Sequence, residues 1–131
     1  METDLINQVN AAKEKRMQLR QLTERLKPLQ DKARTEGRTV TINELLMDYY
    51  CEYYNWKEHV FKSFDEWKST GHRILSGEKA LPLWGKMVTK IVDQQKDIHG
   101  NLIPNTGREI DYLEMEYVFN INQTWIPEYY R

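Results

Sequence analysis

The sequence has few of the features that mark secreted or membrane-spanning proteins. Its single cysteine, Cys51, excludes a disulfide within the chain and is typical of a protein from a reducing compartment. No apolar run approaches the roughly 20 residues that span a bilayer, and the polar N-terminus lacks the apolar stretch of a secretory signal. We therefore expect a cytoplasmic protein without membrane contact.

The sequence also lacks the spaced groups that catalysis and cofactor binding need. The histidines at 59, 72 and 99 lie in unrelated contexts, and no His-Glu-x-x-His pattern is present for a zinc site. The stretch "SGEKALPLWGK" does not have the glycine spacing of a phosphate-binding loop. No nearby residue would activate Cys51, which we interpret as structural. We expect no enzyme, no metal and no cofactor.

Charge is nearly balanced over the whole chain but not along it. Nineteen basic and twenty acidic side chains give a net charge of −1. Residues 1–38 and 57–90 each carry a net charge of +3, whereas residues 39–56 and 91–131 carry −3 and −4. This distribution leaves room for a local basic face. It does not favour strong, salt-resistant binding to duplex DNA. Four Trp, eight Tyr and three Phe predict an aromatic-rich core.

The N-terminal part predicts one long amphipathic helix. Apolar residues recur in it every seven positions, at Leu5, Ala12, Leu19, Leu26 and Ala33. We expect Pro28 to end or kink this helix near Lys27. The helix either lies on its own domain or serves as a dimerising or partner-binding surface. We divide the chain into residues 1–36, a helix with its connector, and residues 37–131, an α+β domain, which form one compact unit overall.

A capping box predicts the start of a second helix. Thr41 can cap the first turn, and Glu44 three residues later can reach back to the cap. We expect this helix to cover residues 43–60.

A second capping box predicts a third helix. Ser63 and Glu66 have the same spacing, so we expect a short helix over residues 64–69. Phe64 and Trp67 are expected to turn inward from it.

The rest of the chain predicts a small sheet. Residues 76–79 would form a turn between two strands, and in the second strand alternation places four residues on one face, namely Trp84, Lys86, Val88 and Lys90. A turn-rich loop leads to another strand at 112–122, and an irregular tail packs through Trp125. The predicted fold is α+β, with a long N-terminal helix and two further helices on a small, mostly antiparallel sheet.

The face that carries Trp84 combines the groups that hold single-stranded nucleic acid. Aromatic rings lie under bases in such sites, and cations follow the backbone. Lys86 and Lys90 share the face, and Arg73 and Lys79 would lie on the adjoining hairpin. Two alternatives stay open. Trp84 could be buried in the core, and lysines at a turn often serve only solubility.

The stretch "FKSFDEWKSTGHRILSGEKALPLWGK" resembles the N-terminal domain of ArdC-type antirestriction proteins. It shares the order of a Phe-Lys-x-Phe-x-x-Trp motif, a glycine, a short strand, Gly-Glu-Lys and an apolar strand ending in tryptophan. A second stretch is similar to the closing element of that family at Tyr117, Val118, Phe119, Asn120 and Gln123. "GRTVTINELL" more loosely matches an upstream family stretch at Gly37, Arg38 and Asn43. The resemblance covers roughly residues 37–125.

The resemblance implies an α+β domain that binds single-stranded DNA in plasmids or transposons that enter a cell as single strands. In full-length relatives a zinc-peptidase-like domain follows, and it has no counterpart in these 131 residues, so no protease activity is implied. Asn120 and Gln123 are expected to fix the sheet edge; the alternative is that either contacts a base.

We predict a non-enzymatic module of a mobile element, such as a conjugative transposon, that binds single-stranded DNA with low sequence specificity and is related to antirestriction. Trp84 would stack on a base, and the cations that would contact phosphates are Arg38, Lys68, Arg73, Lys79, Lys86 and Lys90. The main alternative is a protein-interaction or adaptor module that uses residues 1–35 to form a homodimer or bind a partner protein, without nucleic acid. An uncharacterised enzyme is the third alternative.

Overall fold

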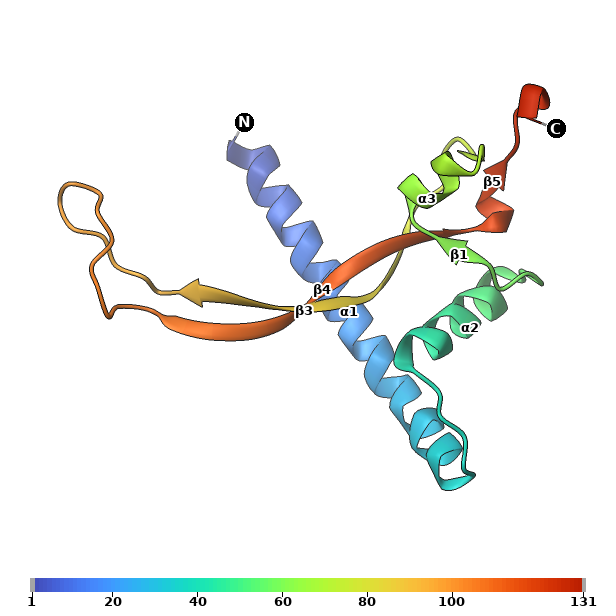
Figure 1. The fold of residues 1–131 in the computed structure, drawn as a ribbon, viewed down its shortest axis with the longest axis horizontal. Helices are drawn as coiled ribbons and strands as arrows, with labels where there is room; N and C mark the ends of the chain where they lie inside the picture. The colour runs from blue at the N-terminus through green and yellow to red at the C-terminus, as the bar shows by residue number, and fades with distance from the viewer. Residues whose placement is uncertain (1, 131) are drawn as a thin grey trace. The chain divides into compact units, whose positions relative to one another are not determined.

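The computed structural model describes the backbone of residues 2–130 and the side chains of residues 10–129. The α+β fold is as predicted, with two helices first and a third helix between the first two strands (Figure 1). The helices are α1 (Glu2–Thr35), α2 (Ile42–Tyr54) and α3 (Phe64–Ser69), with short 3-10 turns η1 (Ile121–Gln123) and η2 (Glu128–Tyr130). The strands are β1 (Phe61–Lys62), β2 (Arg73–Ile74), β3 (Leu81–Val92), β4 (Arg108–Asn120) and β5 (Thr124–Trp125).

The chain forms two compact units. The helical unit comprises residues 1–83 and 116–131, and the ribbon unit comprises residues 84–115. β3 and β4 each contribute residues to both. The predicted division between residues 36 and 37 stays a prediction. Of the helices in the described part of the chain, none has the length and apolarity needed to cross a bilayer.

Helix α1 continues past its proline. We expected Pro28 to end or kink it near Lys27, but the helix reaches Thr35. The side chain of Pro28 is exposed, so water can bond the backbone carbonyl that loses its helical partner there.

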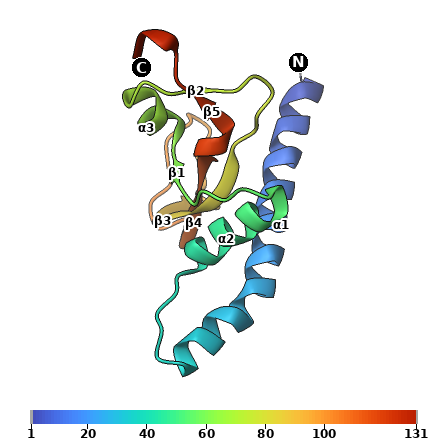
Figure 2. The same ribbon diagram turned by 90° about the vertical axis from the view of Figure 1, so that its right-hand side faces the viewer.

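Most of the described apolar residues in the seven-residue series on α1 are buried inside the helical unit, where α1 packs against α2 (Figure 2). Leu19, Leu26 and Ala33 are buried, whereas Ala12 is exposed. The side chain of Leu5, the first member of the series, lies outside the described residues. The helix therefore lies on its own unit over most of the described series.

Helix α2 begins as predicted and ends early. Both hydrogen bonds of the Thr41–Glu44 capping box are present. The helix stops at Tyr54 because Asn55 adopts a left-handed conformation with φ of 58°, which asparagine tolerates better than most residues. The predicted extension to residue 60 is wrong.

Helix α3 also has its predicted capping box, between Ser63 and Glu66. Trp67 is buried, as expected. Phe64 is exposed, so its predicted inward orientation is wrong. It occupies the first position of a six-residue helix, and Trp67 fills the packed side one turn later.

The strands pair differently from the prediction. β2 does not form a hairpin with β3 across the turn at 76–77; it pairs antiparallel with β5, with Arg73 opposite Trp125. The three-stranded sheet has the order β1-β4-β3. β3 and β4 have 12 and 13 residues, so their pairing supplies many more ladder hydrogen bonds than a two-residue strand could.

The core sits in the helical unit and is mainly aliphatic. Tyr50 and Trp67 are its buried aromatic residues among the described side chains, while most other aromatic rings are partly or largely exposed. The expected aromatic-rich core is therefore wrong. Trp125, which was expected to pack the tail, is 46% exposed, and the tail instead forms β5.

Candidate nucleic-acid interface

The predicted nucleic-acid residues fall in both units. Trp84, Lys86 and Lys90 belong to the ribbon unit, on β3. The other four belong to the helical unit, namely Arg38, Lys68, Arg73 and Lys79.

Two contacts show which side chains of β3 and β4 share a face of the ribbon unit. The hydroxyl of Thr89 donates to the carboxylate of Asp111. The Nζ atom of Lys90 lies 5.1 Å from the ring centroid of Tyr112. Because successive side chains point to opposite faces of a strand, Tyr112 lies on the same face as Trp84 and Lys86.

We call this side the Trp84 face, defined by Trp84, Lys86, Val88, Lys90 and Tyr112. Trp84 is half-buried, and Lys86 and Lys90 are exposed. Neither lysine forms an ion pair within the part of the chain that the structure describes. The face therefore presents two ammonium groups and two partly accessible aromatic rings.

Acidic groups limit the positive potential of the ribbon unit. Alternation along β4 places Glu114 on the Trp84 face, two residues beyond Tyr112. Residues 84–115 hold four basic and five acidic side chains. The face can therefore contact a few phosphates but cannot attract a polyanion over a long distance.

The cations of the helical unit do not form one cluster. Arg38 pairs with Glu36 at 2.7 Å. Arg38 lies in the connector that follows α1. In both ribbon views this connector is at the opposite end of the helical unit from α3, which carries Lys68 (Figures 1 and 2). Arg73 is half-buried and donates to the backbone carbonyl of His72 at 3.4 Å. Arg38 thus does not extend a path through Lys68 and Arg73.

The Gly-Glu-Lys turn is tied to Gln123, after the end of β4, by two part-buried hydrogen bonds. Gln123, 2% exposed, donates through Nε2 to a carboxylate oxygen of Glu78 at 3.1 Å and to the carbonyl of Lys79 at 2.9 Å. Its Oε1 accepts from the backbone N–H of Asn120 at 2.8 Å. The expected structural role of Asn120 and Gln123 is confirmed, while the ammonium of Lys79 stays exposed.

An exposed aromatic row at the end of α2 is a feature that sequence reasoning did not use. The rings of Tyr54 and Trp56 stack with centroids 4.6 Å apart, and Tyr53 is 69% exposed beside them. Helix α2 has three carboxylates and no basic residue. These carboxylates would repel phosphates, so the row does not extend a nucleic-acid path.

Two observations bear on metal binding and on the reactivity of Cys51. No group of three or more His, Cys, Asp or Glu residues among the described side chains could hold a metal ion. Cys51 is buried, and its pKa is raised by that burial first and then by the charges of Asp48 and Glu58. A thiol with a raised pKa is a poor nucleophile, which agrees with a structural role.

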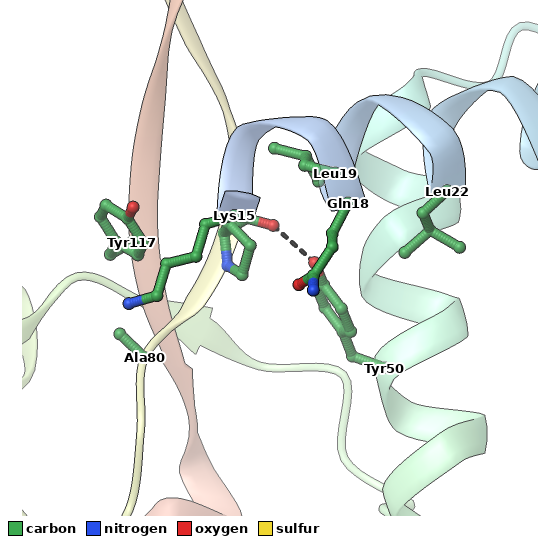
Figure 3. A pocket seen from close by; sticks show the side chains of 8 residues that line it. Lys15, Gln18, Leu19, Leu22, Tyr50, Ala80 and Tyr117 are labelled. Carbon is green, nitrogen blue, oxygen red and sulfur yellow. Dashed lines mark hydrogen bonds between the residues drawn. The ribbon is translucent and has the colours of Figure 1, made fainter. Parts of the chain in front are cut away.

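Sequence reasoning also missed a cavity in the helical unit (Figure 3). Its volume is about 260 Å³, and its lining comes from α1, α2, the start of β3 and the end of β4. The lining residues are Lys15, Gln18, Leu19, Leu22, Tyr50, Ala80, Pro82 and Tyr117. No local pattern joins segments so far apart in the sequence, so only the tertiary structure could reveal the cavity.

Comparison with protein-family models, with curated proteins and with solved structures gives no match for this chain. The resemblance to ArdC-type N-terminal domains rests on the sequence motifs alone.

Proposed function

We propose that the chain is a non-enzymatic module of a mobile genetic element that binds single-stranded DNA with low sequence specificity, in a process related to antirestriction. One observation carries the proposal. Trp84, Lys86 and Lys90 share one face of β3, and Lys90 lies over the ring of Tyr112 on the neighbouring strand. The cytoplasmic location expected from the sequence belongs to the same proposal.

The Trp84 face would hold a strand through stacking and through contacts to phosphates. Every base has a π-face, so stacking on Trp84 or Tyr112 would discriminate little between sequences. Lys86 and Lys90 are four residues apart, which is about 13 Å along an extended strand. They would therefore contact phosphates that are not adjacent.

Two phosphate contacts give weak binding that depends on salt. Each contact contributes about −0.7 to the slope of log affinity against log salt for a single strand, so we expect a slope of about −1.4. Fluorescence anisotropy of a labelled oligothymidine should give a dissociation constant of tens of micromolar in low salt. Duplex DNA of the same length should bind more weakly, because its bases are already stacked.

Variants of the Trp84 face test the proposal. Lys86→Gln with Lys90→Gln should weaken binding about tenfold, and Trp84→Ala should weaken it by a similar factor. Lys96→Gln is the matched control, because Lys96 is exposed in the same unit outside the Trp84 face. The proposal fails if about 50 μM protein gives no anisotropy change in low salt, or if the double variant binds as wild type.

A second candidate is a protein-interaction module that forms a homodimer through the other face of the ribbon unit. Met87, Ile91 and Leu113 are 62%, 55% and 37% exposed. Thr89 and Asp111 contact each other on that face. Met87, Ile91 and Leu113 are each two residues from Thr89 or Asp111, so strand alternation places them on the same face. Exposed apolar patches often mark interaction surfaces. Residues 1–35 are a weaker candidate, because Leu19 and Leu26 are buried within the unit.

Light scattering distinguishes the two candidates. A dimer that becomes a monomer in Met87→Lys, without DNA binding in either form, would favour the interaction module. A surface substitution is a cleaner test than deleting residues 1–35, because the deletion removes Leu19 and Leu26 from the core.

A further inference from the structure

We infer that the cavity of the helical unit shown in Figure 3 binds a small apolar carboxylate. The inference is independent of DNA binding, because every lining residue belongs to the helical unit and none to the Trp84 face.

Most of the cavity lining is apolar. Leu19 is buried at 2% exposure, and Leu22 lies one turn further along α1. Ala80 and Pro82, from the segment that enters β3, and the ring of Tyr117 complete the lining. Such a surface favours a hydrocarbon or aromatic group over water.

The polar groups in the wall do not all need a ligand. The hydroxyl of Tyr50 already donates to the carbonyl of Pro82 at 2.7 Å, and burial is the main cause that raises its pKa. It therefore stays a neutral, occupied donor. The amide of Gln18 makes only a long contact of 3.5 Å with Glu14, so it can turn toward a ligand.

Lys15 gives the cavity its charge. Its Nζ atom lies 5.9 Å from the ring centroid of Tyr117, and Figure 3 shows it beside Tyr117 and Ala80. No Asp or Glu lines the cavity. Within the described side chains Lys15 forms no ion pair. A single ammonium next to an apolar floor matches one carboxylate attached to an apolar group.

Size and charge exclude other ligand classes. A volume of about 260 Å³ is slightly below the roughly 300 Å³ at which ligand pockets usually begin. A ligand with about ten non-hydrogen atoms fits that space. A dianionic phosphate would have one cation to pair with, and a cationic ligand would be repelled by Lys15.

Three probes that differ only in their polar end test the inference, with two-dimensional amide NMR of the full chain as the readout. 3-Phenylpropanoate should bind with a dissociation constant of about 1 mM and shift amide signals around the cavity. 3-Phenylpropanamide, which is neutral, should bind about fivefold more weakly, and 3-phenylpropylamine should not bind. Equal shifts from all three probes, or shifts centred elsewhere, would overturn the inference.

Variants assign the effect to the cavity. Lys15→Gln should remove the preference for the carboxylate over the amide, while Lys13→Gln on the same helix should retain it. Ala80→Phe should block the cavity and abolish binding of both probes. If Ala80→Phe does not fold, the Lys15→Gln comparison alone decides, and an unchanged carboxylate preference in that variant refutes the site.

One further probe identifies the source of the carboxylate. A free acid and the C-terminus of a peptide share the same chemistry. N-acetylglycyl-phenylalanine that competes with 3-phenylpropanoate and binds more tightly would assign the site to peptide C-termini. Weaker binding of the peptide would assign it to free acids.

Discussion

The indole N–H of Trp67 donates a hydrogen bond of 2.8 Å to the backbone carbonyl of Phe119. The two residues are 52 positions apart, and the bond joins α3 to the end of β4 within the helical unit. Trp67 is 1% exposed and contacts the ring of His72 and the ammonium of Lys62. A single side chain thus anchors α3 by packing and by a directed polar contact.

Replacing Trp67 with phenylalanine should lower the free energy of unfolding by about 2–4 kcal/mol. The smaller ring leaves a cavity, and the Phe119 carbonyl loses its donor in a buried place. Urea denaturation measures the change. Trp125→Phe, at a side chain that is 46% exposed, should cost less than about 1 kcal/mol. Equal losses in both variants would contradict the anchoring role of Trp67.

Asn120 makes the second buried polar connection. Its Nδ2 donates to the carbonyl of Glu58 at 2.7 Å, and its Oδ1 accepts from the backbone N–H of Asn122 at 2.8 Å. Asn120→Asp keeps the shape but places an oxygen against the Glu58 carbonyl at a site with 0% exposure. We expect a loss of about 3 kcal/mol in urea unfolding. Asn101→Asp, at an exposed amide, should be near neutral, and comparable losses would refute the prediction.

Two glycines allow backbone strain to be separated from steric clash. Gly77 and Gly107 have φ of 84° and 89°, so alanine costs roughly 1 kcal/mol at either position from its backbone alone. A Cβ atom at Gly107 would also lie 2.9 Å from the Val92 carbonyl oxygen, whereas nothing lies within 4 Å at Gly77. Gly107→Ala should therefore accelerate amide exchange in β3 and β4 more than Gly77→Ala does. Similar exchange in both variants would exclude the clash.

The capping box of α3 should produce a measurable pKa shift. The backbone N–H of Ser63 donates to the Glu66 carboxylate at 3.1 Å, and this bond, followed by the Ser63 side chain, lowers the pKa of Glu66. A lowered folded-state pKa stabilises the protein above the unfolded value of about 4.3. That contribution is lost as the pH falls through the folded value. Carboxyl carbon NMR should give a pKa below the ordinary range, and Ser63→Ala should raise it; no difference would disprove the coupling.

Local sequence patterns predicted the elements whose hydrogen bonds close within a few residues. The two capping boxes at Thr41 and Ser63 formed as expected. The pattern of β3 likewise placed Trp84 with Lys86 and Lys90. The end of α2 was missed because Asn55 took a left-handed conformation that its neighbours did not signal.

Strand pairing lay beyond local patterns. A short turn separates β2 from β3 and would have allowed the two strands to pair. Instead β3 pairs with β4, and β2 pairs with β5. The outcome depended on total ladder length, which no single segment contains.

The amino-acid sequence by itself determined where α2 and α3 begin and which residues of β3 share a face. Capping hydrogen bonds and strand alternation act between residues two to four positions apart, so a short stretch of sequence is enough to predict them. Only the tertiary structure decided that Lys90 lies over Tyr112, that Arg38 is apart from Lys68, and that α1, α2, β3 and β4 together line a cavity. These relationships arise from the packing of distant segments, and packing depends on the whole chain at once.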